Sequence, residues 1–480
     1  MASEVSGEGS VLERLGAALA VRVERWMPSP FLFAILLTYI VFVVGIAGTG
    51  TGPADMVWHW YDGFWTFLEF AMQMVLILMT GFVIAYHPRV NDLLTRLTRV
   101  PSNGKQAVVL VGVFAMIVGW IHWGLGLILG AVLAREMGKT AHENGVALHY
   151  PLACVAAYMG LGLTWHWGLA GSAPLLLATP NNDFIEAGVL EETVPLTETV
   201  IHPYGLALTV LSIAFASIVL YLLSPSPERS RGIEEYVSED ELAEAVADGG
   251  ASEATVEREG DADAVTEPEA TVPAERINDS RVLGGLIALT GVAVVAYSLA
   301  FAGLEVLNIN FVNFAMLFAG LLVYQRPQYY RERFGEAATA AAGIILLFPF
   351  FAGIQGMMTG SGLATEIAEA LLAVSSPETF PVAAWVAAAV VNLFVPSGGG
   401  EWIVLGPSVL EAAQAQGISV GQATMAYAVG DAHTNLLNPF WALPLLAITE
   451  IRAREMFGYA IAMLLALIPF LAVVLYLVPY

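Results

Sequence analysis

The sequence is poor in lysine, cysteine and charge of either sign. Of its 480 residues, 13% are charged, and the 19 cations include only two lysines, Lys105 and Lys139. Cys154 is the single cysteine, which excludes an intramolecular disulfide and a cysteine metal cluster. The catalytic spacings HExxH and GxSxG are also missing. These absences exclude a disulfide framework and give no support to an enzyme.

What the sequence has instead is apolar residues. They make up 57% of the chain, whose mean hydropathy is +0.69, and they recur in long runs such as 31–48 and 459–478. A bilayer core about 30 Å thick needs roughly 20 such residues per helix. The predicted fold is therefore an all-α polytopic membrane protein. We predict nine membrane crossings, near residues 31–48, 64–86, 149–178, 200–223, 282–303, 309–324, 338–358, 422–450 and 456–479.

Acidic residues are concentrated in one polar stretch. Residues 228–281 contain 17 acidic and 5 basic residues, so they contribute −12 of the formal net charge of −24. Their composition predicts a disordered cytoplasmic linker at 225–281, which separates a first transmembrane repeat, 31–224, from a second, 282–480. The pattern of residues 1–30 does not fit a signal peptide. It predicts an amphipathic helix on the membrane surface. Acid-rich, lysine-poor exposed segments also indicate a salt-rich cytoplasm, as in a halophile.

Three short patterns in the first half of the chain recur in the second half in the same order. The pairs are 77–82 with 356–361, 124–133 with 400–410, and 166–178 with 433–447. Their nearly constant offsets predict two homologous structural repeats.

The distribution of Arg and Lys predicts that the two repeats are inverted. Cation-bearing short loops should lie on the cytoplasmic side with the N-terminus and the linker, and they are 87–105, 135–148, 325–334 and 451–455. The apolar run 106–134 lies between two of them, and its 29 residues span about 43 Å as a helix. That is too long for one crossing and too short for two, so we predict a re-entrant hairpin from the cytoplasm. Its counterpart at 381–410 has cation-free flanks and should enter from outside; a hairpin arm could instead be a further crossing.

Residues 392–402, NLFVPSGGGEW, are the most unusual stretch of the apolar regions. Pro and Gly disfavour a helix interior by about 3 and 1 kcal/mol, so PSGGG is not ordinary membrane helix. Non-helical backbone survives at membrane depth only when it is buried or lines a watered cavity, and glycines let the backbone approach a ligand. Tight helix packing is the alternative. Residues 160–172 and 430–441 are likewise predicted to be broken helices.

Permanent cations are absent from both candidate site regions. No Lys or Arg occurs between Lys139 and Arg229, or between Arg333 and Arg452. An anionic substrate would then be held by backbone N–H groups at broken-helix N-termini, by polar side chains or by a protonated histidine. Charge balance implies a cotransported cation. The polar candidates are Ser397, Thr434, Asn435 and Asn438, the histidines are His166 and His433, and the oxygen ligands for Na⁺ or H⁺ coupling are Asp431, Asn435 and Asn438.

Each of these assignments has an alternative in which the residue has only a structural role. An intramembrane aspartate is a functional candidate by default, but Asp431 and His433 could merely satisfy each other in the core. His122 and His166, taken singly, could equally be packing residues.

Several longer motifs match a known family. They are WMPSPFLFAILLT, INFVNFAMLFAGLL, FVPSGGGEW, NPFWALPLLAI and GLAGSAPLLLATPNN. With them the chain resembles the short-chain fatty acid (acetoacetate/butyrate-type) transporters of the ion transporter superfamily, over essentially all of its length outside the linker. The resemblance implies uptake of short-chain monocarboxylates by an elevator-like mechanism with two hairpins. By position it implies a site at Trp123, Gly124, Trp165, Gly171, Ser172, Pro174, Ser397, Gly398, Gly399, Gly400, Trp402, Asp431, Asn435, Pro439 and Trp441. The residue after the glycines varies in such proteins, so Glu401 is a weaker candidate than Asp431.

The predicted function is secondary active transport of short-chain monocarboxylates coupled to Na⁺ or H⁺, with no other cofactor and no enzymatic activity. The expected partners are the carboxylate and the lipid bilayer of the cell membrane, not nucleic acid, and a homodimer is left open. One alternative is a carrier of C4-dicarboxylates or other organic anions from the same superfamily. The other is an intramembrane metal-dependent enzyme that uses His122, His166, Asp431 and His433.

Overall fold

A computed structural model of the chain describes residues 30–66, 68–180, 182–237, 273–394 and 397–480. The predicted N-terminal surface helix, most of the predicted linker and Pro396 lie outside these residues. All regular secondary structure within the described ranges is helical, as the sequence predicts.

The first half of the chain contains ten α-helices in the described ranges. They are α2 (Pro30–Thr49), α3 (Pro53–Gly63), α4 (Leu68–Ala85), α5 (Pro88–Leu97), α6 (Gly104–Ile121), α7 (Trp123–Glu143), α8 (Tyr150–Met159), α9 (Ser172–Ala178), α10 (Asp183–Glu186) and α11 (Pro203–Leu223). The second half contains α13 (Pro273–Asn278), α14 (Arg281–Ala302), α15 (Ile309–Tyr324), α16 (Pro327–Gly360), α17 (Leu363–Leu372), α18 (Phe380–Asn392), α19 (Gly398–Ala415), α20 (Val420–Thr434), α21 (Leu443–Thr449) and α22 (Ala453–Leu477).

Six of the described helices are long and apolar enough to cross a membrane, or seven if the α4–α5 pair, bent by 74°, is one span. Every predicted crossing has a helical counterpart, but four of these counterparts are not among the six long helices. They are α4, which qualifies only together with α5, the broken helices α8–α9 and α20–α21, and α15, with 16 residues. The sixth long helix is α6, the first arm of the predicted hairpin.

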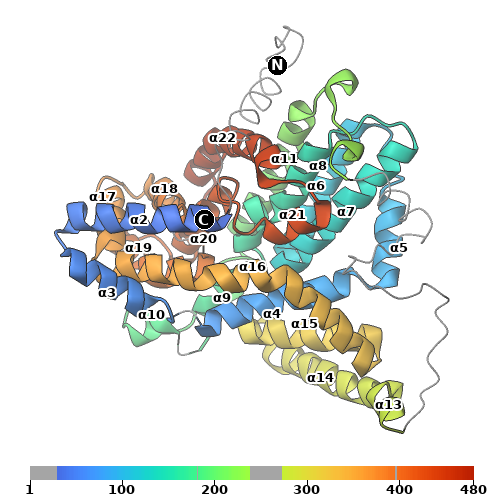
Figure 1. Cartoon of the computed structure of the whole chain (residues 1–480). Coiled ribbons are helices and arrows are strands. Elements are labelled where there is room, and N and C mark those ends of the chain that lie inside the picture. The colour runs from blue at the N-terminus through green and yellow to red at the C-terminus, as the bar shows by residue number, and fades with distance from the viewer. Residues whose placement is uncertain (1–29, 67, 181, 238–272, 395–396) are drawn as a thin grey trace.

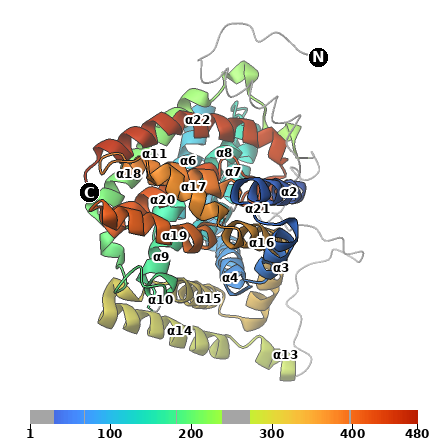
Figure 2. The same cartoon turned by 90° about the vertical axis from the view of Figure 1, so that its left-hand side faces the viewer.

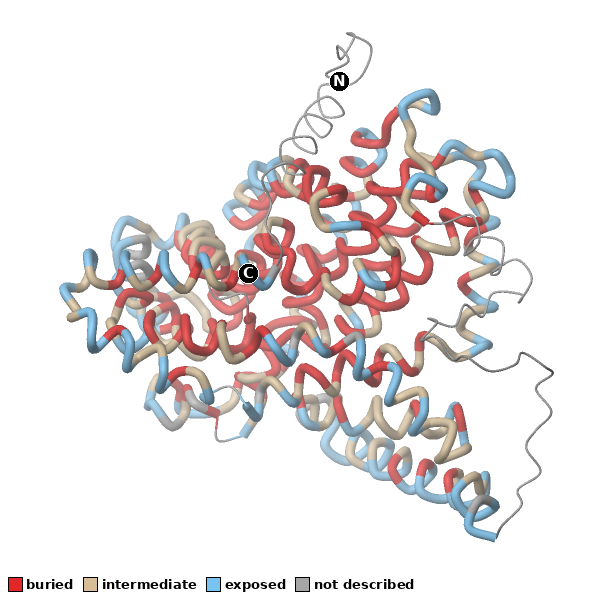
Figure 3. The backbone as a smooth tube through the Cα atoms, in the orientation of Figure 1, coloured by how far each residue is buried: buried red, intermediate tan, exposed pale blue. Residues whose placement is uncertain are grey.

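The helices form a large packed body with a smaller helical layer along one side (Figure 1). α16 runs across the molecule and packs against α2, α3 and α4, and α14 and α15 pack together beside α4. The body contains α6 to α8, α11, α18 to α20 and α22, as Figure 2 shows from the side. Its backbone is buried along most of its length, whereas α14 is largely exposed (Figure 3). An exposed face of apolar residues on α14 suits contact with lipid.

In each segment predicted to be a re-entrant hairpin, the structure has two helices that pack on one another. His122 ends α6 and begins α7 in an extended conformation, and its Nδ1 accepts a hydrogen bond from the Leu125 N–H at 3.1 Å. The two arms approach closely, because a Cβ at Gly126 would lie only 2.5 Å from the Gly119 nitrogen. α18 and α19 form the second pair. In each half a broken helix follows the hairpin, so the same order of elements recurs.

Three short helices lie between the predicted crossings. α3, α5 and α17 all follow a longer helix directly, and α3 and α5 begin at a proline, which is well suited to the first turn. α16 also begins eleven residues earlier than the crossing predicted at 338, so most of the expected loop 325–334 is helical. At the start of the predicted linker, Ile233 and Val237 are buried against the body.

The opposite orientation of the two hairpins can be tested with one matched pair of cysteines. Val100, before α6, and Val374, before α18, are 68% and 84% exposed. In a Cys154→Ala background, V100C should react with a membrane-impermeant maleimide from the cytoplasmic side and V374C from the outside. The cysteine-free parent is the control. Reaction of both from the same side would contradict the inverted arrangement.

Candidate functional site

The broken helix of the first half passes through the centre of the body. α8 gives way to a π-helical turn at Gly160–Thr164 and a 3₁₀ turn at Trp165–Trp167 before α9 begins at Ser172. Single π-helical turns often occur at functional sites. The irregular backbone is fixed by neighbouring helices, because the Thr164 hydroxyl donates to the Met116 carbonyl at 2.7 Å. The chain is thus held in a non-helical path that exposes polar groups inside the protein.

The broken helix of the second half lies against it. Between α20 and α21 the side chain of Asn392, from α18, donates to the Asp431 carbonyl at 2.7 Å and to the Thr434 hydroxyl at 2.8 Å. The Asn435 amide donates to the Leu161 carbonyl at 3.2 Å and so joins the two breaks. The Asn438 side-chain oxygen accepts from the Phe440 N–H at 3.0 Å. Asn435 and Asn438, predicted coupling-ion ligands, therefore brace the broken segments.

A buried ion pair connects the two broken helices. His166 Nδ1 lies 2.5 Å from the Asp431 carboxylate, and both side chains are at most 1% exposed. His166 Nε2 accepts a hydrogen bond from the Ala173 N–H at 3.0 Å. Because Nε2 accepts, the ring proton belongs on Nδ1, where it faces Asp431. The contact places a ring nitrogen from the first half of the chain beside a carboxylate from the second half.

His433 has a different environment. Its Nε2 lies 3.0 Å from the Leu464 carbonyl of α22, and its ring packs near Trp385. The partner of Asp431 is thus His166 from the other half, not the neighbouring His433. The structure places His433 between helices, apart from the pocket residues described next.

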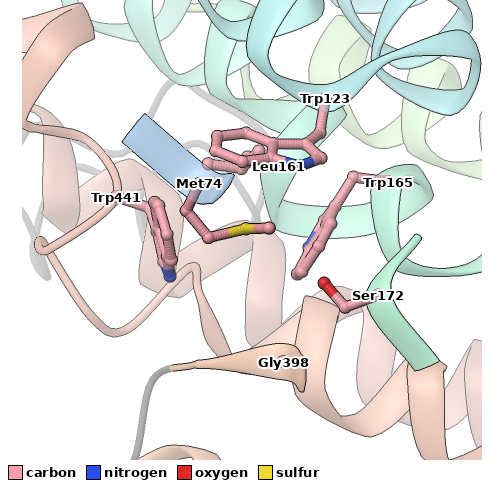
Figure 4. Close-up of a pocket in the computed structure, with 7 residues that line it drawn as sticks. All are labelled: Met74, Trp123, Leu161, Trp165, Ser172, Gly398 and Trp441. Carbon is pink, nitrogen blue, oxygen red and sulfur yellow. The ribbon is translucent and has the colours of Figure 1, made fainter. Parts of the chain in front are cut away.

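A small pocket lies beside the pair, where both halves of the chain meet (Figure 4). It is lined by Met74, Trp123, Leu161, Trp165, Ser172, Gly398 and Trp441. The Trp123 ring packs edge-on against Trp165 and Trp441, with ring centroids 6.1 and 5.3 Å apart. Trp165 also stacks on His166 at 4.3 Å. Indole rings therefore form most of the wall, and the His166–Asp431 pair lies behind one of them.

The polar part of the pocket is formed by Ser172 and by the start of α19. Figure 4 shows both Ser172 and the Gly398 backbone on the side of the pocket opposite Trp123. The first N–H groups of a helix have no acceptor within it, and this end of α19 consists of three glycines. A Cβ at Gly398 would lie 2.7 Å from both the His166 and Trp165 rings, so only glycine fits. The buried Ser397 hydroxyl has no hydrogen-bond partner among the described residues.

Comparison with known proteins assigns a family. A family model for short-chain fatty acid transporters matches residues 11–478. A protein of Escherichia coli strain K12, named as a candidate short-chain fatty acid transporter, is 36% identical over 455 residues, which is 95% of this chain and 97% of that protein. A Haemophilus influenzae Rd protein of the same name is 32% identical over 470 residues, or 97% of this chain and 100% of that one. The chain belongs to the short-chain fatty acid transporter family.

Membership of the short-chain fatty acid transporter family and the long apolar helices identify a multi-pass membrane protein. Among solved structures, the YdaH transporter of Alcanivorax borkumensis, whose topology is described as unusual, is 16% identical. It gives a TM-score of 0.45 over 93% of this chain and 98% of that one. A likeness of this size does not define the topology of the present chain.

Five of the predicted substrate-site residues line the pocket, and the others are not among the residues that line it. The five are Trp123, Trp165, Ser172, Gly398 and Trp441. Trp402 is buried between Phe184 and Tyr427, and Gly124 allows α7 to approach α4, since a Cβ there would lie 2.8 Å from the Ile77 oxygen. Gly399 and Gly400 are buried in the first turn of α19, where Gln355 donates to the Gly400 carbonyl at 3.0 Å. Thr434 and Gly171 belong to the breaks themselves.

The structure gives no support to the alternative of an intramembrane metal-dependent enzyme. Within the described ranges, no group of three or more His, Cys, Asp or Glu side chains is arranged to hold a metal ion. His122 caps α7, His166 pairs with Asp431, and His433 contacts α22. Apart from the contact between His166 and Asp431, the side chains proposed for such a centre therefore have separate environments.

Proposed function

We propose that this chain is a secondary active transporter that moves short-chain monocarboxylates, of butyrate and acetoacetate size, together with Na⁺ or H⁺. The observation that supports this best is the composition of the pocket wall. Three indoles give an apolar space for a short alkyl chain, and the glycine end of α19 with Ser172 gives hydrogen-bond donors for a carboxylate. The substrate class named for its relatives has the same two parts.

The anion would be held without a lysine or arginine. Neither residue occurs between Lys139 and Arg229 or between Arg333 and Arg452, and the pocket residues come from these two segments and α4 to α7. Backbone N–H groups and the positive end of the helix dipole can bind a carboxylate in place of a side-chain cation. The Ser397 hydroxyl, buried at the same helix end, is a further donor. Binding by N–H groups leaves the overall charge uncompensated, which supports cotransport of a cation.

We assign the coupling role to the buried pair of Asp431 and His166. A carboxylate at membrane depth costs about 2.5–3.5 kcal/mol on insertion scales. The presence of Asp431 beside the pocket therefore supports a functional role for this residue. Trp165 lies in the pocket wall and stacks on His166, so substrate and ion would be only one side chain apart. That proximity gives a direct route for coupling.

The proposed motion is elevator-like. The hairpins and broken helices pack on one another, in the groups α6 to α8 and α18 to α20, whereas α16 packs with α2 to α4 and α15 with α4. The pocket lies where the first group meets α4, which contributes Met74. Displacement of the packed body relative to α4 and α16 would carry the pocket from one side of the membrane to the other.

The pocket gives no comparable support for a dicarboxylate. A C4-dicarboxylate needs a second anion site at the far end of the molecule, where the described wall consists of Trp123, Trp441 and Met74. Burying a charged carboxylate among apolar groups without a partner is strongly unfavourable. A monocarboxylate has no such cost.

Solute counterflow tests the proposed function. Proteoliposomes loaded with unlabelled butyrate should transiently accumulate labelled butyrate from outside, which a carrier with an alternating site does and a channel does not. Because undissociated acid crosses lipid unaided, the assay belongs at about pH 8, where carboxylic acids are ionised. Protein-free liposomes are the control.

A competition series in the same assay defines the substrate class. Acetoacetate should compete with labelled butyrate, and succinate should not. Equal competition by succinate would favour the dicarboxylate carrier, and the absence of counterflow with every acid tested would refute the carrier.

A further inference from the structure

Glu401 is a second carboxylate buried beside the pair, in a position that the proposed function has not used. It lies in the first turn of α19, directly after the three glycines, and it is 1% exposed. Neither carboxylate oxygen makes a hydrogen bond of normal geometry within the described part of the chain. Its neighbours on α19 contact the surroundings of Asp431: Trp402 packs on Tyr427 of α20 with ring centroids 4.3 Å apart, and Gly398 lies against the ring of His166, which contacts Asp431. Unpaired buried carboxylates are rare because an isolated charge is strongly disfavoured there.

The described groups that surround Glu401 do not neutralise the charge of its carboxylate. α20 packs beside α19 with Tyr427 and Asp431, and His166 lies behind Asp431 with its Nδ1 2.5 Å from the carboxylate. α9 and α18 contain no titratable residue, and α16 and α10 face α19 with Gln355 and Phe184. On α17, Glu366 and Glu369 are exposed.

Two carboxylates therefore share a buried region with no described permanent cation. Two like charges placed this close cannot both be ionised without a large penalty. One bound cation removes this electrostatic penalty.

We propose that Glu401 and Asp431, with His166 as hydrogen-bond donor, form a proton-binding site, and that the coupling ion of this transporter is H⁺. This inference rests on the proposed function and specifies its coupling ion. The site holds one proton shared by two carboxyl groups. The proton is taken from water on the side where substrate enters, travels as the neutral carboxyl group, and is released to water on the other side.

The fold couples this proton to the substrate through α19. The substrate carboxylate is proposed to sit at the N-terminus of this helix, and Glu401 lies in its first turn. An ionised Glu401 repels the anion and occupies the same helix dipole, whereas a protonated Glu401 does neither. Each ligand thus raises the affinity for the other by the same factor, typically 5- to 150-fold for coupled sites.

The surroundings of Asp431 favour a proton over Na⁺. The Asp431 oxygen nearest His166 faces an N–H donor, and imidazole is a poor partner for hard cations, which prefer oxygen. The side-chain oxygens of Asn435 and Asn438 already accept hydrogen bonds from Asn392 and from the Phe440 N–H. A dehydrated Na⁺ would have to displace these contacts, and a proton would not.

Calorimetry of butyrate binding tests the proton site on the purified full-length protein. Titrations in two buffers of different ionisation enthalpy count the protons taken up per butyrate. Between about pH 6 and pH 9, butyrate itself stays ionised, so uptake reports the protein. The parent should take up a number of protons that approaches one as the pH rises, and its dissociation constant should rise by up to about tenfold per pH unit.

Glu401→Gln keeps the shape of the side chain in its neutral state. It should bind butyrate with an affinity that hardly changes with pH, and without proton uptake. Glu401→Asp keeps an ionisable group and should restore proton uptake. Glu411→Gln is the matched control, because Glu411 is an exposed carboxylate on the same helix, and it should behave as the parent does. Thermal unfolding verifies that each variant is folded.

Three results would overturn the inference. They are butyrate binding by the parent without proton uptake, affinity that depends on Na⁺ at constant pH, and unchanged proton uptake in folded E401Q. The parent measurements decide the matter even if E401Q fails to fold. A parent that binds no monocarboxylate would refute the proposed function, and the proton site with it.

Discussion

Replacing Asp431 by asparagine should abolish accumulation of butyrate against its gradient while leaving butyrate exchange. Asparagine keeps the size of the side chain and can still lie against His166 Nδ1, which is 2.5 Å from the carboxylate in the parent. It removes the second negative charge that makes proton binding at this site favourable. The accumulation ratio driven by an ion gradient should therefore fall from well above one to about one. The measurement is uptake in proteoliposomes with an imposed gradient, beside counterflow without one.

Asp62→Asn is the control for this variant, since Asp62 is an exposed carboxylate on α3. It should accumulate butyrate as the parent does. A D431N protein that accumulates substrate like the parent, with the same ion dependence, would disprove the coupling role of Asp431.

Gly398→Ala should weaken butyrate binding by roughly 5- to 150-fold. The added methyl group would lie 2.7 Å from atoms of both His166 and Trp165, so one ring or the start of α19 must move. Overpacking of this kind costs about 1–3 kcal/mol, and each 1.4 kcal/mol is about tenfold in affinity. Because the displaced groups form the pocket, binding should suffer more than folding. Equilibrium binding of labelled butyrate measures the affinity, and thermal unfolding measures the stability of the fold.

Gly285→Ala provides the matched control. A Cβ at Gly285, on α14, would meet no atom within 4 Å, and alanine should slightly favour the helix. Its butyrate affinity should equal that of the parent. Parent-like affinity in folded G398A would show that the glycine end of α19 does not bind substrate.

The apolar helices could be predicted well because their signal is strong and local. The crossings predicted at 31–48, 200–223 and 456–479 correspond to α2, α11 and α22, whose observed ends differ by a few residues. Short amphipathic helices such as α3 and α5 could not be predicted in the same way. Their formation depends on packing against α16 and α7, which the sequence does not show.

The breaks in the apolar runs could be placed because glycine and proline interrupt these runs where a helix would otherwise continue, whereas the three glycines of PSGGG form the first turn of α19. The glycines from Gly160 to Gly171 have this property. What could not be predicted is how the two breaks meet. The partner of Asp431 is 265 positions away at His166, and neighbouring His433 was the more obvious candidate by sequence distance.

Several site residues carried no distinctive signal. Met74 and Leu161 line the pocket but look like ordinary membrane residues, and Asn392 sits at the end of a helix without a charge or repeat to mark it. Glu401 did carry a signal, since it is the one charge in a long apolar region. Its variability among similar proteins made it a weaker candidate, yet in this chain it is buried beside Asp431.

The central claim is that a short-chain carboxylate binds between Trp123, Trp165 and Trp441 at the start of α19, and fluorine NMR tests it most directly. In protein labelled with 5-fluorotryptophan, each of the 11 tryptophans gives its own signal, assigned by single substitutions. Adding butyrate should shift the signals of these three residues and leave those of Trp58 and Trp65, which are 61% and 57% exposed, unchanged. Saturable butyrate binding that leaves all three pocket signals in place would contradict the account.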